Sequence, residues 1–265
     1  MPFRPYQHEL EQLYRHCNRA ELAEGDPVAF CRRFEDPADR EVVALVSAGL
    51  AYGRVAQIMR SIERLLAVMG PAPARAVVDR SAGQWRKALG DWKHRFATAE
   101  EMADLLAAAG GALRRSGSME AYFCAHAGDE PCSAAAGLAG LVDALRGFGA
   151  PVGHLLPHPG RGSACKRLHL MLRWLVRCDD VDPGGWSAAG PRCLIVPMDV
   201  HMHRISKTLG ATRRSSPDAR SAREVTEAFA RLCPDDPVRY DFALTRVGIA
   251  PAAVEPSKLL RRLRP

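Results

Sequence analysis

The chain has 265 residues, of which 47% are hydrophobic and 25% charged, a composition typical of globular proteins. Lysine and arginine outnumber aspartate and glutamate by 37 to 30, so the net charge is +7 and a polyanionic partner is favoured. No apolar run approaches the roughly 20 residues that a membrane-spanning helix needs, and residues 1–5 lack the apolar core of a secretion signal. We therefore expect no membrane association and a cytoplasmic location.

The eight cysteines are scattered along the chain, and none forms a C-x-x-C pair. In a cytoplasmic chain of this length, such cysteines are expected to be reduced thiols. We therefore expect no iron–sulfur cluster and no zinc site, and no cofactor of another kind. The cysteines are Cys17, Cys31, Cys124, Cys132, Cys165, Cys178, Cys193 and Cys233.

Helical periodicity dominates the chain, and strand alternation is nearly absent. Asp36 and Pro37 form a typical helix start, and the apolar face of this helix runs to Leu50. A break at residues 51–54 precedes a second amphipathic helix from Val55 to Met69. The segment that follows is basic and less regular, and contains Trp85, Trp92 and His94-Arg95-Phe96.

Capping patterns place the next helices. Thr98 and Glu101 form a capping box for a helix through about residue 113. A short helix is expected over 118–126, a loop over 127–133, a helix over 134–148 and a turn-rich connection over 149–162.

The helix after Ser163 buries a stripe of leucines and methionine, and places Lys166, Arg173 and Arg177 on another face. Residues 179–192 read as a loop in which Asp180 and Asp182 are turn residues.

Three more helices are expected near the C-terminus. One begins at Asp199 and ends at Gly210, one begins at a capping box of Ser221 and Glu224, and one spans 240–247. We predict an all-α fold of about ten helices in two lobes. One lobe comprises residues 36–177, and the other comprises residues 1–35 and 178–265.

The stretch Gly160-Arg161-Gly162-Ser163 is a tight turn that leads into a helix with Lys166 and Arg167 in its first turn. Backbone N–H groups and the positive dipole end of a helix bind anions there. Lys166 is either an ordinary solvated lysine or an amine nucleophile whose pKa the dipole and the neighbouring arginines lower.

Asp199 follows the apolar run Leu194-Ile195-Val196 and is placed to cap a helix. A capping carboxylate is fixed in space, which a catalytic carboxylate also requires, so the two interpretations are compatible. His201 and His203 lie about 200° apart on the same helix, so we expect them to hold no metal ion.

Tyr52, Gly53 and Arg54 lie in the break between two apolar helices. They form either a plain helix–helix corner or an aromatic and cationic probe of a distorted base step.

Three features together resemble the helix-hairpin-helix DNA glycosylase superfamily: the hairpin turn, the lysine helix, and Val-Pro-Met-Asp-Val-His at residues 196–201. The separation from Lys166 to Asp199 is 199 − 166 = 33 residues. This long gap is more similar to that of archaeal-type 8-oxoguanine DNA glycosylases than to the shorter gap in most of the superfamily. Residues 30 to 250 also resemble a bacterial and archaeal family of unknown function, through Leu50-Ala51-Tyr52-Gly53-Arg54, His94-Arg95-Phe96, Gly162-Ser163-Ala164-Cys165-Lys166-Arg167-Leu168, Leu172-Arg173-Trp174 and 236–244.

The resemblance implies a two-lobed all-α fold that binds double-stranded DNA containing a damaged base, as a monomer. Lys166 would attack the sugar as the nucleophile, and Asp199 would stabilise the cationic sugar in a base-excision reaction with strand scission. It also implies a nucleoid location on DNA. Backbone contacts are expected from Tyr52, Gly53, Arg54, Gly160, Arg161, Gly162, Ser163, Arg167 and His201, and the base pocket from Tyr240, Asp241 and Phe242.

This sequence departs from the superfamily pattern in its turn, Pro-Gly-Arg-Gly in place of Pro-Gly-Val-Gly, and in lacking a C-terminal cysteine cluster. Two alternatives stay open: a non-catalytic DNA- or RNA-binding protein that retains the fold, and an enzyme acting on another nucleoside or nucleotide.

Overall fold

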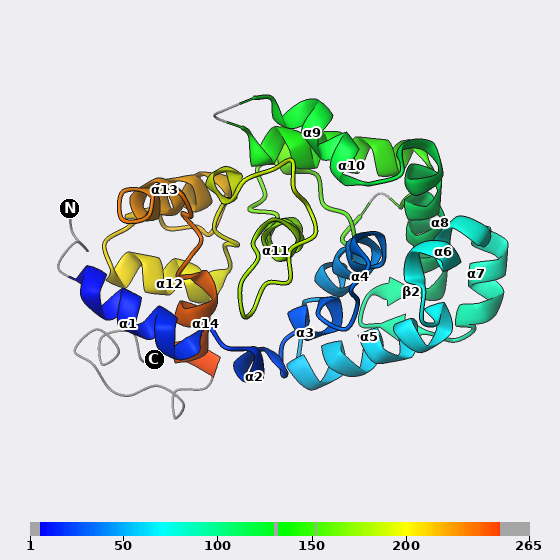
Figure 1. Cartoon of the computed structure of the whole chain (residues 1–265), viewed down its shortest axis with the longest axis horizontal. Coiled ribbons are helices and arrows are strands. Elements are labelled where there is room, and N and C mark those ends of the chain that lie inside the picture. The colour runs from blue at the N-terminus through cyan, green and yellow to red at the C-terminus, as the bar shows by residue number, and fades with distance from the viewer. Residues whose placement is uncertain (1–5, 130–131, 152, 250–265) are drawn as a thin grey trace.

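The computed structural model describes residues 6–129, 132–151 and 153–249, and shows a mostly helical protein (Figure 1). Within these ranges, fourteen α-helices accompany a single two-stranded hairpin, which confirms the all-α class. Among the described helices, none is both long and apolar enough to cross a bilayer. The ends of the expected terminal lobe, residues 1–5 and 250–265, lie outside the described residues.

Figure 1 shows α11 end-on in the middle of the molecule, with α4–α8 on one side and α1 and α12–α14 on the other. The α-helices are α1 (Gln7–Cys17), α2 (Ala20–Ala23), α3 (Val28–Cys31), α4 (Pro37–Gly49), α5 (Val55–Met69), α6 (Pro73–Asp79), α7 (Ala82–Leu89), α8 (Ala99–Ser116), α9 (Glu120–Ala127), α10 (Ala134–Gly147), α11 (Lys166–Val176), α12 (Val200–Thr208), α13 (Ala219–Ala230) and α14 (Asp241–Ile249). Two short 3-10 helices, η2 (Pro159–Arg161) and η3 (Pro191–Cys193), lie in the connections.

Local caps explain where several helices begin. The Asp36 side chain accepts a hydrogen bond of 2.8 Å from Ala38 N at the start of α4, as expected. Thr98 and Glu101 form the expected capping box of α8. The box expected at Ser221 is wrong, because Asp218 caps α13 and Ser221 N donates to it at 2.8 Å. Asp218 is the N-cap because α13 begins at Ala219, so that Ser221 is already a residue of the first helical turn.

The basic segment after Met69, which the sequence indicated to be irregular, has regular secondary structure. It contains α6, α7 and the hairpin of β1 (Lys93–His94) and β2 (Ala97–Thr98). The Ser81–Gln84 capping box begins α7, and the buried ring of Trp85 anchors it. The hairpin was missed because its turn uses Arg95 at a φ of 52° instead of a glycine or asparagine.

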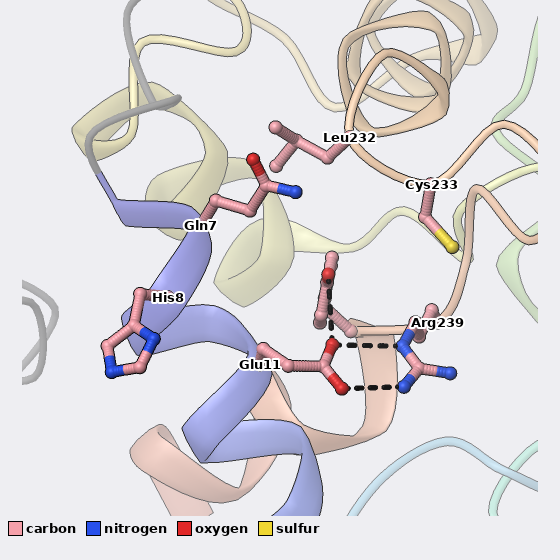
Figure 2. A pocket seen from close by; sticks show the side chains of 7 residues that line it. Gln7, His8, Glu11, Leu232, Cys233 and Arg239 are labelled. Atoms are coloured by element: carbon pink, nitrogen blue, oxygen red, sulfur yellow. Dashed lines mark hydrogen bonds and ion pairs between the residues drawn. The ribbon is translucent and has the colours of Figure 1, made fainter.

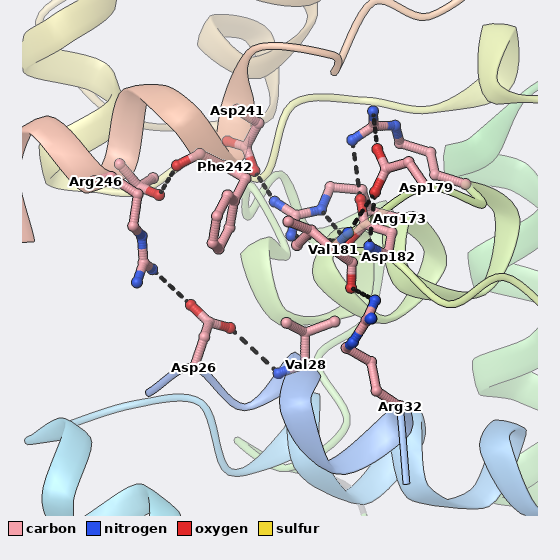
Figure 3. A network of polar contacts seen from close by, with 12 residues as sticks. Asp26, Val28, Arg32, Arg173, Asp179, Val181, Asp182, Asp241, Phe242 and Arg246 are labelled. Carbon is pink, nitrogen blue, oxygen red and sulfur yellow. Dashed lines mark hydrogen bonds and ion pairs between the residues drawn. The ribbon is translucent and has the colours of Figure 1, made fainter. Parts of the chain in front are cut away.

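A stripe of α11 that the sequence placed on a polar face is in fact buried. Arg173 and Arg177 are 3% and 4% exposed, and each donates to the fully buried carboxylate of Asp182. Arg173 also pairs with Asp241 at the start of α14 (Figure 3). Asp182 is therefore more than a turn residue, because it neutralises two cations of α11 in the interior.

Cys132 and Cys193 form a disulfide, with their Cα atoms 5.4 Å apart. The expectation that all eight cysteines are reduced thiols is therefore wrong for this pair. The two residues are 61 positions apart, and only the tertiary fold brings the start of α10 against η3. Spacing along the sequence carries no signal for such a pair.

Replacing Cys132 with serine is expected to lower the free energy of unfolding by up to ~4 kcal/mol, because the bond restricts a long loop in the unfolded chain. Denaturant melting with and without a dithiol reductant measures the change. Reductant should destabilise wild type but leave Cys132→Ser unaffected. Cys178→Ser, at an exposed free cysteine, is the control and should melt like wild type. Equal melting of wild type with and without reductant contradicts the prediction.

Candidate functional site

Lys166 and Asp199 meet at the starts of two helices. Lys166 is the first residue of α11, and its Nζ lies 2.6 Å from Oδ2 of Asp199, the N-cap of α12. The two side chains are 35% and 25% exposed, so the pair is partly open to solvent. A small ligand therefore has access to both groups.

The carboxylate of Asp199 is held from three directions. Its Oδ1 accepts hydrogen bonds from His201 N at 2.9 Å and Met202 N at 2.8 Å, while Oδ2 accepts from Lys166. Asp199 is thus both a helix cap and the ion-pair partner of the lysine. Burial acts to raise the pKa of Asp199, but the Lys166 ammonium and the backbone donors outweigh it and hold the pKa below its usual value.

The turn before α11 satisfies most of its own N–H groups. Gly160 N donates to His158 Nδ1 at 3.0 Å, and Arg161 N and Gly162 N donate to His158 and Pro159 carbonyls. The Gly162 backbone takes a φ of 78°, a conformation that favours glycine. The Arg161 side chain of this turn is exposed, and it has no ion-pair partner among the described residues.

Arg167 and Tyr52 hold the corner together. Arg167 Nη1 donates to Gly49 O at 2.5 Å and its Nη2 donates to His154 O, while its guanidinium lies 5.0 Å from the centre of the Tyr52 ring. Tyr52 Oη donates to His94 O at 3.0 Å. Both side chains therefore have partners inside the protein.

An exposed aromatic side chain that was not among the expected DNA contacts lies beside this corner. Phe96, at the tip of the β1–β2 hairpin, is 69% exposed, and its ring lies edge-on to His154, 6.2 Å away. Arg95 lies over the Phe96 ring, and its side chain fills the space above Gly53, where an added Cβ would come within 2.7 Å of it. Gly53 has a φ of 99°, a backbone conformation that favours glycine.

The three late-helix candidates have different surroundings. Tyr240 Oη donates to Glu11 at 3.3 Å and lines a separate cavity of about 590 Å³ (Figure 2). Phe242 is buried between Arg173 and Arg246. That cavity is lined by Gln7, His8, Glu11, Leu232, Cys233, Arg239 and Tyr240.

Asp241 is the late-helix candidate most closely tied to Lys166. One of its oxygens pairs with Arg173, and the other, Oδ1, is buried without a hydrogen-bond partner among the described residues. Burial raises the pKa of Asp241, against the opposing charges of Arg173 and Lys166. Asp241 therefore offers a buried acceptor within electrostatic reach of the lysine–aspartate pair.

The remaining expected contact residues are mostly exposed. Gly53 and Arg54 are exposed at the start of α5, Ser163 Oγ accepts from Cys165 N at 3.3 Å, and His201 is exposed on α12. Within the described ranges, no group of three or more histidine, cysteine or acidic side chains is arranged to hold a metal ion.

These observations define an all-α protein with a lysine–aspartate ion pair formed between the first turns of two helices. The chain belongs to the family described as "Protein of unknown function (DUF2400)", whose model matches residues 26–250. Both Lys166 and Asp199 lie within the matched region. No curated protein and no solved structure matches the chain.

The ion pair is expected to make stability depend on acid pH. Because the pKa of Asp199 is lowered on folding, its contribution is present above the unfolded value near 4 and is lost as pH falls through the folded value. Asp199→Asn keeps a good cap but removes the charge. We expect the variant to be less stable than wild type by ~1 kcal/mol at pH 6, given the partial exposure of the pair.

Thermal melting of both proteins from pH 6 to pH 3 measures this difference, which should shrink on acidification. Asp36→Asn is the matched control, because Asp36 caps α4 without an ion pair among the described residues. A difference that stays constant down to pH 3 contradicts the assigned pairing.

Proposed function

We propose that this protein is a DNA glycosylase with AP lyase activity that removes an oxidised purine, 8-oxoguanine being favoured, and that its helices form the two-lobed helix-hairpin-helix glycosylase fold. The observation that carries the proposal is the 2.6 Å contact between Lys166 Nζ and Asp199 Oδ2. An amine and a carboxylate at this separation, both partly accessible, provide a nucleophile and a fixed negative charge.

In the proposed reaction, the target nucleotide leaves the duplex and its C1′ approaches Lys166. The ammonium first passes a proton to Asp199 or to water, which frees the lone pair. The amine then forms a bond to C1′ as the bond from C1′ to the base breaks, and the base leaves with a proton. The nitrogen lone pair then forms a double bond to C1′ as the bond from C1′ to the ring oxygen O4′ breaks and O4′ takes up a proton, which gives a protonated Schiff base. Removal of a proton from C2′ then allows β-elimination, in which the bond from C3′ to its phosphate oxygen breaks.

Asp199 suits the charge development in that reaction. Its carboxylate is anchored by two backbone N–H groups, so it needs no reorganisation when positive charge grows on the sugar. The lowered pKa keeps it ionised at neutral pH. The same ion pair also fits a purely structural role, which is why a non-catalytic DNA- or RNA-binding protein is the alternative.

Duplex binding is supported by exposed cations at the expected contact positions. Arg54 and Arg161 are exposed, and the net charge is +7. Because Tyr52 is engaged by the protein, Phe96 is the better-placed aromatic to enter a base step. An exposed ring at a hairpin tip partly unstacks bases, which assists extrusion of a nucleotide.

For the base pocket, we favour Asp241 over Tyr240 and Phe242. The partnerless Oδ1 of Asp241 is a hydrogen-bond acceptor. 8-Oxoguanine carries a donor N–H at N7, where guanine has a lone pair, so a carboxylate oxygen there attracts the lesion and repels the normal base. Arg173 holds the other oxygen and fixes the orientation.

Trapping with borohydride tests the lysine directly. Lys166→Gln keeps length and polarity but removes the amine, so it should fold and bind a lesion duplex yet give no covalent adduct and no strand break. Asp199→Asn should fold and bind, with base excision slowed by about two orders of magnitude or more. Single-turnover cleavage of an 8-oxoguanine duplex, beside melting curves, supplies the measurement.

Full activity of Lys166→Gln rules out the Schiff-base mechanism. If Asp199→Asn loses activity only in proportion to lost stability, Asp199 is a cap and nothing more. Wild-type protein that binds duplex but never gives an adduct favours the non-catalytic alternative.

Phe96→Ala is expected to slow lesion excision by about tenfold, because loss of base stacking costs ~1–3 kcal/mol. Phe96→Leu retains an apolar side chain and should recover much of the activity. Excision rates and a fluorescent base analogue that reports unstacking measure both variants. Equal rates for wild type and Phe96→Ala exclude the ring from the reaction path. Because Phe96 is exposed, both variants should keep the wild-type melting temperature.

A further inference from the structure

The turn that precedes α11 has a structural neighbour that the sequence analysis did not connect with it. Ala219 N, at the start of α13, donates to Gly162 O at 3.2 Å, and Ser163 forms an antiparallel bridge with Asp218. The connection from α12 to α13 therefore lies directly beside the Pro-Gly-Arg-Gly turn. The two segments are about 55 residues apart in the chain but make one continuous surface.

This neighbouring segment is strongly cationic. Residues 210–223 contain four arginines and one aspartate, a net charge of 4 − 1 = +3. Arg214 is neutralised, because it lies 3.0 Å from Asp218 and 3.9 Å from Glu224. The other three, Arg213, Arg220 and Arg223, are exposed and have no ion-pair partner among the described residues.

The segment is also held in place by its own contacts. The Thr212 hydroxyl is buried, donates to Glu224 at 2.6 Å and accepts from Arg214 N at 3.2 Å. Ser221 Oγ donates to the carbonyl of Ser216, and Asp218 caps α13. Because the backbone is already ordered, binding a ligand there costs little conformational entropy.

We propose that residues 211–218 and the first two turns of α13 form, with the turn at 159–163, a composite phosphate-binding surface for duplex DNA. Arg161 contacts one stretch of backbone, and Arg213 and Arg220 contact the stretch beside it. The surface reads no base, since it presents charge and exposed serine hydroxyls instead of a shaped pocket. This inference rests on the proposed function and extends its DNA footprint to an element that the sequence analysis left unassigned.

The test compares two double variants that lose the same charge. Arg213→Gln/Arg220→Gln alters the proposed surface, whereas Lys87→Gln/Arg115→Gln removes two exposed cations on α7 and α8, on the opposite side of Figure 1 from α13. Fluorescence anisotropy with an undamaged labelled duplex, from about 50 to 300 mM salt, gives affinity and salt slope. We expect the first double variant to bind about tenfold more weakly at low salt, with a slope reduced by about 1.8.

The control double variant should bind nearly like wild type. Unchanged binding by Arg213→Gln/Arg220→Gln, or equal losses in both double variants, overturns the composite surface. If Arg161→Gln still weakens binding in either case, the proposed function survives that failure. Wild-type protein without salt-dependent duplex binding removes the proposed function itself, and tighter binding of single-stranded RNA overturns the duplex assignment. Melting curves confirm that each variant is folded.

Discussion

One stripe of α11 holds the two sides of the molecule together. Lys166 and Arg173 lie seven residues apart on the same face of α11, and Arg177 follows as the C-cap residue of the helix. Each pairs with carboxylates from the chain after residue 178, on α12, on α14 or in the connections. Arg173 and Arg177 are almost fully buried, so removing one partner costs about 3–5 kcal/mol. The register of α11 against the terminal helices is therefore fixed electrostatically, and Lys166 is its solvent-facing end.

This arrangement explains how far the sequence could predict the structure. Helix starts such as Asp36 and Thr98 were correct because a cap depends on neighbours within three residues. The capping role of Asp199 was correct for the same reason, and its contact with Lys166 was anticipated only through the family resemblance. Periodicity placed Arg173 on a polar face, since its partner Asp241 lies 68 residues away and leaves no local trace.

The exposure of side chains around the Lys166–Asp199 pair was also hard to predict from the sequence. The sequence placed Tyr52 and Arg167 among the expected DNA contacts. In the structure both side chains donate hydrogen bonds to backbone carbonyls, and the Arg167 guanidinium lies against the Tyr52 ring. Phe96 is exposed because a hairpin of four paired residues carries it outward, and its turn lacks the residues that mark such hairpins. Residue type alone therefore could not show which side chains near these helix starts bind the protein itself and which face solvent.

The residue just before the lysine carries a different implication. Cys165 is buried and adopts a left-handed backbone at φ 43°, a conformation that costs a side-chain-bearing residue roughly 1–2 kcal/mol. That strain is held by the packing of its own side chain and of α11. Glycine at this position would relax the backbone but empty the packed site and loosen the first turn. The strained backbone of Cys165 thus lowers the local stability slightly, and it sets the orientation of Lys166 at the start of α11.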